Sequence, residues 1–190
     1  MSKIGKKLII IPAEVEVKKT VDNLEFSSKD GKKHIKVEIL PYIEAKLEGD
    51  KLTFTITDEK SIQARSNWGT IRALSQNAID GIVKGFSKIL DIQGVGFRAT
   101  VEGGKTLVLN IGFSHPVKMA IPEGITMSVD KNNSVTISGI NKAAVGEIAA
   151  KIRALKKPNP YLGTGIKYRD EIIKKKAGKK AAAASVGGAG

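Results

Sequence analysis

In the stretch IEAKLEGDKLTFTI, residues 43–56, two runs of alternating apolar and polar residues flank a tight turn. Apolar side chains occupy every second position on both sides of Gly49-Asp50, a period that is typical of half-buried β-strands. The following segment carries apolar residues at helical spacing from Trp68, interpreted as a core or interface residue, to Ile82. A helix can bury the apolar face that a short meander cannot bury alone. This pattern predicts an α+β unit in which one helix covers an antiparallel sheet.

The residues before this hairpin show the same alternation. Val15 and Val17, then Leu24 and Phe26, alternate with polar residues, and residues 34–39 repeat the pattern. Gly, Asn and Asp residues separate these short runs, as they do between strands that are joined by turns. We therefore expect an antiparallel meander before the helix.

The same order of elements occurs a second time, about 82 residues further along the chain. Residues 117–119 correspond to residues 35–37 at a shift of 82, and residues 135–137 correspond to residues 52–54 at a shift of 83. A second apolar-periodic segment, residues 145–155, takes the place of the first helix. The repeat predicts two duplicated modules, each an antiparallel β-sheet packed against one α-helix.

The repeat also predicts how the chain is divided. Residues 1–82 form the first α+β module and residues 83–156 the second. Residues 157–180 form a basic C-terminal extension, and the low-complexity tail 181–190 is expected to be disordered.

Positive charge is concentrated near the C-terminus. The whole chain has 32 Lys and Arg residues against 19 Asp and Glu, a formal net charge of +13. Residues 151–180 alone carry 11 basic and 2 acidic side chains. Such asymmetry indicates an anionic partner, either nucleic acid or an acidic membrane surface.

Composition excludes several classes of protein. The chain has no cysteine, which rules out a disulfide scaffold, thiolate zinc sites and thiol catalysis. No apolar run approaches the ~18 residues that indicate a membrane-spanning helix. The N-terminal apolar run, residues 8–11, is too short for the core of a signal peptide. We expect a cytoplasmic protein without membrane association.

The residues provide little support for catalysis. His34 and His115 have no metal-ligand spacing to a carboxylate and no evident nucleophile, so both are interpreted as strand-end or turn residues. GVGFRA, residues 94–99, matches the dinucleotide-binding fingerprint, but that motif must open a helix and here a strand pattern follows. No catalytic residue, metal, cofactor or small-molecule substrate is expected. Two alternatives stay open: a nucleotide-dependent enzyme that uses the Gly94 loop, and membrane attachment through the terminal lysines.

The extension combines backbone flexibility with cations and aromatic rings in PNPYLGTGIKYRDE, residues 158–171. Its prolines prevent a helix, and its glycines permit sharp turns or a close approach to a partner. Tyrosines can stack on unpaired bases, and lysines that neutralise phosphates release counterions. Fully extended at ~3.3 Å per residue, residues 157–180 would reach roughly 80 Å. We expect an extended strand that becomes ordered on contact with RNA.

This stretch resembles the signature of the bacterial-type ribosomal protein L-six family of the large subunit, whose pattern reads Pro-x-Pro-Tyr-Lys-Gly-Lys-Gly-Ile-Arg-Tyr. The likeness covers about residues 2 to 180. Leu162 and Thr164 stand where the family usually has lysines, and Lys167 stands in place of arginine. Other motifs that agree with the family are SKIGK at 2–6, GVGFRA at 94–99, GFSHPV at 112–117, IPEGI at 121–125 and VGEIAA at 145–150.

The resemblance implies a non-enzymatic structural protein of the large ribosomal subunit with two duplicated α+β domains. It implies binding to large-subunit ribosomal RNA near the sarcin-ricin loop and the factor-binding stalk base, beside neighbouring ribosomal proteins, in support of translation. By position it assigns RNA contact to Pro160, Tyr161, Gly163, Gly165, Lys167, Tyr168 and Arg169, and to Ser114 and His115 of the Ser-His-Pro turn. The charge pattern adds Arg153, Lys156, Lys157, Lys174, Lys175 and Lys176.

Overall fold

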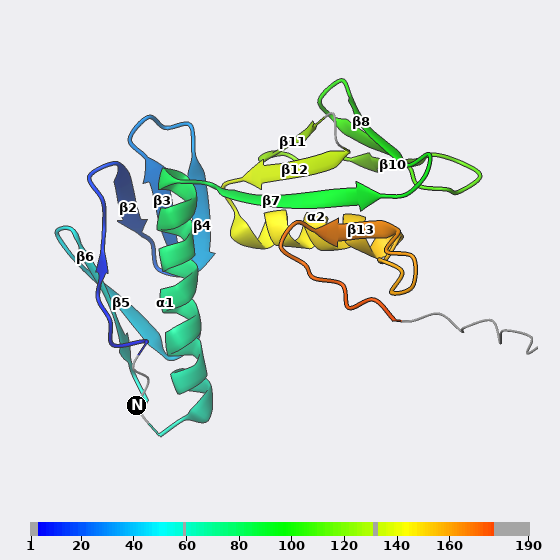
Figure 1. The fold of residues 1–190 in the computed structure, drawn as a ribbon. Coiled ribbons are helices and arrows are strands. Elements are labelled where there is room, and N and C mark those ends of the chain that lie inside the picture. Colours follow the sequence, from blue (N-terminus) through cyan, green and yellow to red (C-terminus); the bar gives the residue numbers. More distant parts are fainter. Residues whose placement is uncertain (1–3, 59, 131–132, 177–190) are drawn as a thin grey trace, which may run out of the picture.

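A computed structural model describes residues 4–58, 60–130 and 133–176 of the chain (Figure 1). Among the described residues the first half forms two three-stranded antiparallel sheets, ordered β1-β6-β5 and β2-β3-β4, with one helix packed against them. The hairpin expected in residues 43–56 is present, with Ile43 opposite Ile56 and Leu47 opposite Leu52. The elements are β1 (Ile9–Ile10), β2 (Val15–Lys19), β3 (Asn23–Ser28), β4 (His34–Glu38), β5 (Ile43–Glu48), β6 (Lys51–Ile56) and α1 (Ile62–Val83).

The second half repeats this arrangement and adds one strand. Its described residues form a four-stranded sheet, β11-β12-β7-β13, and a three-stranded sheet, β10-β9-β8. Apart from β13, its strands and helix correspond in order and pairing to those of the first half, which confirms the predicted duplication. The elements are β7 (Phe86–Gln93), β8 (Arg98–Glu102), β9 (Thr106–Asn110), β10 (Val117–Ala120), β11 (Ile125–Val129), β12 (Ser134–Gly139), α2 (Lys142–Leu155) and β13 (Gly165–Tyr168).

The predicted α+β class is therefore confirmed, with one difference in detail. Each half divides its strands between two sheets, where the alternation pattern suggested one continuous meander. The division falls between β4 and β5 and between β10 and β11. The first strand of each half joins the later sheet, because β1 pairs with β6 and β7 pairs with β12. These strands lie far apart in the sequence, and local periodicity carries no information on such pairing.

Helix α1 includes the predicted apolar-periodic segment and begins one turn or more before it, at Ile62. The Ser61 hydroxyl accepts a hydrogen bond from the Ala64 N–H at 3.3 Å, a favourable N-cap. Trp68 lies in the core, where its indole N–H donates to the Phe54 carbonyl at 2.8 Å, so a polar tip is satisfied inside an apolar cluster. The buried positions follow helical spacing and include Ala64, Trp68, Ile71, Ala78, Ile79 and Ile82.

Helix α2 is shorter and covers the four-stranded sheet. The Asn141 side chain accepts a hydrogen bond from the Ala143 N–H at 2.9 Å and caps its N-terminus. Val145, Ile148 and Ile152 are buried on one face of the helix. They belong to an aliphatic core that is distinct from the core beneath α1.

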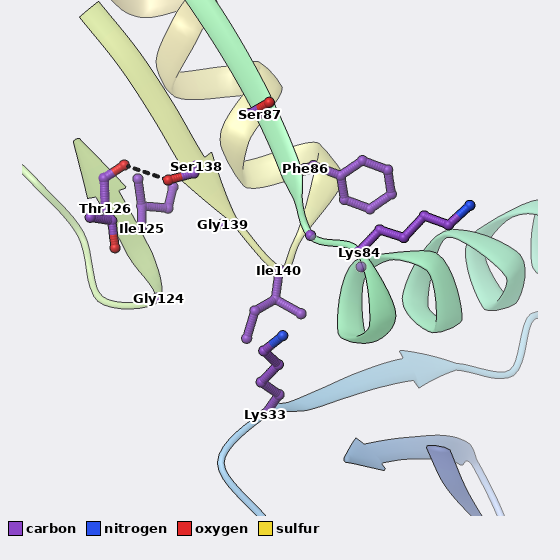
Figure 2. Close-up of a pocket in the computed structure, with 12 residues that line it drawn as sticks. Lys33, Lys84, Phe86, Ser87, Gly124, Ile125, Thr126, Ser138, Gly139 and Ile140 are labelled. Atoms are coloured by element: carbon purple, nitrogen blue, oxygen red, sulfur yellow. Dashed lines mark hydrogen bonds between the residues drawn. The ribbon is translucent and has the colours of Figure 1, made fainter. Parts of the chain in front are cut away.

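The two halves meet at the end of α1. Figure 2 shows Ile140, between β12 and α2, beside the last turn of α1. Gly81 makes the closest approach, because a Cβ atom at this position would lie 2.1 Å from the Ile140 carbonyl oxygen. The Lys33 Nζ donates to the Ile82 carbonyl at 2.9 Å, and the Lys142 Nζ donates to the Asn77 Oδ1 at 3.2 Å. The Lys33 bond lies within the first module, so a close backbone contact and the Lys142–Asn77 hydrogen bond join the two modules.

No helix in the described ranges is long and apolar enough to cross a membrane. The tail 181–190, with Lys179 and Lys180 before it, lies outside the described residues.

Candidate nucleic-acid interface

The signature stretch contributes a strand to the second module. β13 pairs with β7 in antiparallel register, with Ile166 opposite Ile92 and Tyr168 opposite Leu90. Ile166 is fully buried in the core beneath α2. Residues 165–168, for which the sequence predicted a strand that becomes ordered on contact with RNA, are thus part of the sheet of the second module. A single apolar residue among polar ones is too short a pattern to predict a strand from the sequence. In the structure, the Ile166 side chain fills space between the sheet and α2.

The residues between α2 and β13 form a closed loop. Its base is closed by the Ile166 N–H, which donates to the Lys156 carbonyl at 2.8 Å. Further along the loop, the Asn159 N–H donates to the Thr164 carbonyl at 2.8 Å, and the Asn159 carbonyl accepts from the Gly163 N–H at 2.8 Å. Backbone hydrogen bonds within the segment thus close the loop at its base and near its tip.

Asn159 also shapes the tip of the loop with its side chain. Its Oδ1 accepts a hydrogen bond from the Tyr161 N–H at 2.8 Å, as in the turns that Asn commonly stabilises. Pro160 is half-buried, whereas Tyr161 is 57% exposed and Leu162 is 73% exposed. The tip therefore presents an aromatic ring and an aliphatic side chain to solvent, beside lysines.

The two signature glycines have different roles. Gly165 is buried with a φ of +137°, and a Cβ atom there would lie 2.7 Å from the Lys157 carbonyl oxygen and from the Pro158 Cα. Gly163 has a φ of +76°, but the nearest neighbour of a Cβ atom there would be the Lys175 Cε at 3.6 Å. Gly165 therefore allows β13 to pass against the start of the loop, and Gly163 supplies a turn.

Arg153 forms a two-point ion pair with Glu171. Its Nε donates to Oε2 at 2.8 Å, and its Nη2 donates to Oε1. The two side chains are only 30% and 23% exposed. The guanidinium lowers the pKa of Glu171 below its ordinary value, and the carboxylate raises the pKa of Arg153. Arg153 therefore holds residue 171 against α2 through this ion pair.

Arg169 is likewise engaged within the protein. Its Nη2 lies 3.4 Å from the Asp91 Oδ1 and 3.2 Å from the Ser134 Oγ. The Ser134 hydroxyl in turn donates to Asp91 at 2.8 Å and is itself nearly buried. The network joins the end of β13 to β7 and β12, so Arg169 has a structural partner besides any phosphate.

Tyr168 is half-buried between two cations. The Lys88 Nζ and the Arg153 Cζ each lie 5.8 Å from its ring centroid, within the range of cation–π attraction. The ring thus already has close cationic neighbours in this structure.

The remaining candidate lysines stay on the surface. Lys157 and Lys174–Lys176 are exposed, and Lys156 and Lys167 are half-buried. The Lys176 N–H donates to the Pro160 carbonyl at 3.0 Å, which draws residues 171–176 back alongside the loop tip. We call Lys156, Lys157, Lys167 and Lys174–Lys176 the basic surface.

Ser114 and His115 are exposed in the loop that follows β9. This loop adjoins the C-terminal end of α2, because the Lys156 Nζ lies 5.1 Å from the ring centroid of Phe113. The structure therefore brings the Ser-His-Pro turn close to the base of the signature loop.

No other chemistry is evident in the ranges that the structure describes. They hold no group of three or more His, Asp or Glu side chains that could bind a metal ion. The Gly94 loop joins two strands, β7 and β8, so no helix N-terminus meets it. This geometry agrees with a glycine turn and lacks the anion site of a dinucleotide fold.

Comparisons with known proteins give the chain a family. The family model described as ribosomal protein L6 matches residues 93–169, which include the signature loop, β13 and the Ser-His-Pro turn. A curated relative, large ribosomal subunit protein uL6 of a Nitratiruptor species, is 47% identical over 181 residues, spanning 95% of this chain and 99% of the relative. The chain belongs to the ribosomal protein L6 family.

Other relatives support the same membership. The proteins named uL6 from Bdellovibrio bacteriovorus and from Helicobacter pylori (strain HPAG1) are each 45% identical over 181 residues, with 95% of this chain and 99% of each relative covered. The resemblance noted from the sequence motifs is thereby confirmed. The L6 model spans the loop, the strand and Arg169, but Glu171 lies just beyond its matched residues.

Sequence reasoning missed the polar partners of the two arginines in this L6-family site. Asp91 and Ser134 lie 78 and 35 residues from Arg169, and Glu171 lies 18 residues from Arg153. No spacing rule connects residues at such separations.

Changing Glu171 to Gln should destabilise the protein by about 1–2 kcal/mol at neutral pH, since a charge-assisted and partly buried contact is lost. The pKa of Glu171 is lowered in the folded state. Its contribution is therefore fully present above the unfolded-state pKa and is lost as the pH falls through the lower folded-state pKa. Urea unfolding from pH 7 to pH 3 should show the two proteins converging in acid.

The matched control is Glu147 to Gln. Glu147 also pairs with a cation, Lys151 at 2.7 Å, but both side chains are more than half exposed. Little change in stability is expected there, because exposed pairs contribute little. Equal effects at both positions would contradict a special role for the Arg153–Glu171 pair.

Proposed function

We propose that this chain binds large-subunit ribosomal RNA near the sarcin-ricin loop and the factor-binding stalk base, beside neighbouring ribosomal proteins, and so supports translation. As a member of the L6 family it is a structural, non-enzymatic protein of the large ribosomal subunit. The observation that carries the proposal is the basic surface, where six lysines border one hydrogen-bonded loop of the second half.

In the proposed mechanism the lysines and the arginines have different roles. The lysines of the basic surface neutralise phosphates and release counterions. Arg153 and Arg169 hold the strand and loop in place through Glu171 and Asp91. Contact with RNA then occurs through backbone charge and shape, since A-form helices hide their major-groove edges.

The proposal assigns a role to each part of the chain. The second module, residues 83–156, and the extension, residues 157–180, supply the RNA contact. The first module, residues 1–82, braces the second through the junction at Gly81 and Ile140.

Replacing Lys174, Lys175 and Lys176 together with alanine should weaken binding to an RNA fragment that contains the sarcin-ricin loop and stalk base. Each lost phosphate contact should reduce the slope of log K against log salt by about 1. Filter binding or fluorescence anisotropy between low and moderate salt measures both quantities.

The control variant replaces Lys29, Lys46 and Lys51, which are exposed on the first module. It removes the same charge and should leave affinity and slope nearly unchanged. Equal losses in both variants would show that net charge alone drives binding, and an unchanged slope in the first would remove these lysines from the interface. Stronger binding to anionic vesicles than to the RNA would favour membrane attachment instead.

A further inference from the structure

Three loops meet at one end of the second module. β7 and α2 run toward this end, which lies at the right in Figure 1. Loop 94–97 follows β7, loop 111–116 follows β9, and loop 156–164 follows α2. Contacts between them show that they form a common surface, which we call the three-loop end.

Phe97 joins the first two of these loops. A Cβ atom on Gly94 would lie 2.5 Å from the Phe97 ring, and one on Gly112 would lie 3.2 Å from it. The Phe97 carbonyl accepts a hydrogen bond from the Asn133 Nδ2 at 2.8 Å, which fixes the backbone beneath the ring. The glycines of the GVGF and GFSHP motifs therefore make room for one aromatic side chain, which accounts for a motif that nucleotide binding does not explain.

Phe113, in the second loop, is exposed where Phe97 is enclosed by glycines. Its side chain is 49% exposed, and the Lys156 Nζ lies 5.1 Å from its ring centroid. Burial therefore does not explain an aromatic residue at this position. A half-exposed ring beside a lysine is the arrangement that receives a nucleobase, because the ring stacks on the base while the cation meets the phosphate.

The charges of the three loops favour an anionic partner. The three loops contain Lys156, Lys157 and His115 but no Asp or Glu. Val95 at the tip of the first loop is fully exposed and adds an apolar side chain to this surface. An anionic molecule with flat apolar faces fits this combination.

We propose that Phe113 stacks on an unpaired nucleobase of the ribosomal RNA, with Lys156 at the adjoining phosphate. This inference rests on the proposed function and adds to it a specific aromatic contact outside the signature stretch. The three-loop end thus recognises a nucleotide that is splayed out of a helix, while the basic surface follows the backbone beside it.

The test compares Phe113→Leu, Phe113→Ala and Phe113→Trp in the full chain, with the same RNA fragment as probe. Leucine and alanine should weaken binding roughly 5- to 150-fold, the loss expected for one stacked base, with the salt slope unchanged. Tryptophan should keep or improve affinity because its π-face is larger. The parallel control, Tyr42→Leu, changes an exposed aromatic residue of the first module and should bind as the parent does.

The outcomes separate this inference from the proposed function. If the parent protein binds with a steep salt dependence and Phe113→Leu binds equally well, the stacking proposal fails and the proposed function stands. Failure of the parent to bind the RNA would overturn both. If the leucine variant binds fully and only the alanine variant loses affinity, Phe113 makes an apolar contact without stacking. That result would also reject the inference. Unfolding curves for each variant establish that the fold is intact.

Discussion

Alanine at position 165 is expected to lower the free energy of unfolding by about 3 kcal/mol, because backbone strain and steric overlap act together. Gly165 has a φ of +137°, a conformation that residues with a Cβ atom rarely adopt. The added Cβ would also lie 2.7 Å from the Lys157 carbonyl oxygen and from the Pro158 Cα. Neither neighbour is a flexible side chain, so the backbone itself would have to move. Urea unfolding of the full chain measures the loss.

The consequence should extend to β13 as a whole. Displaced backbone at residue 165 would weaken pairing with Gln93 and the fit of buried Ile166. Amide hydrogen exchange should therefore rise for the residues of β13 more than for those of β11. RNA affinity should fall as well, because the lysines of the basic surface depend on this docked strand for their positions.

Gly163 provides the matched control. Alanine at position 163 would have to adopt a positive φ of +76°. Its Cβ atom would have the Lys175 Cε as its nearest neighbour, at 3.6 Å. A loss of about 1 kcal/mol is expected from conformation alone. Equal losses at positions 163 and 165 would mean that the close approach to residues 157 and 158 contributes nothing.

The second large effect is expected at the junction of the modules. Alanine at position 81 should destabilise the protein by about 2–3 kcal/mol, since overpacking against backbone is costly. Its Cβ would lie 2.1 Å from the Ile140 carbonyl oxygen, within the space where α1 meets the turn before α2. Either α1 bends or the modules separate. A change in the distance between spin labels on the two modules would detect the separation, and urea unfolding would measure the energy.

Gly146 is also a glycine within a helix, but alanine there is expected to raise the stability. It lies within α2, and a Cβ atom there would meet nothing within 4 Å. Alanine should stabilise α2 by about 0.5–1 kcal/mol, because glycine is the poorer helix former. If Gly81→Ala were also stabilising, the contact with Ile140 would not constrain the modules.

Local patterns predicted the individual elements well. The alternation in residues 43–56 predicted the strands β5 and β6, and the apolar spacing predicted the helices α1 and α2. Period and propensity act between neighbouring residues, so a single sequence contains the necessary information. The duplication was visible for the same reason, because both copies obey the same local pattern.

Pairing between distant strands was not predictable in this way. β1 and β7 each join a strand that lies far along the chain, and the strands of each half belong to two sheets. β13 completes the second sheet although its sequence shows only one buried apolar residue, Ile166. These choices depend on which sheet edge is open and which space beside α2 needs filling, and both exist only once the rest of the module has folded.

The candidate site shows the same division. Composition alone located the positive charge in residues 151–180, and the motifs alone indicated the family. Only the tertiary structure distinguished the arginines that hold β13 from the lysines that face solvent. The physical reason is that the role of a charge depends on its neighbours: Asp91 lies 78 residues from Arg169 in sequence but 3.4 Å from it in space.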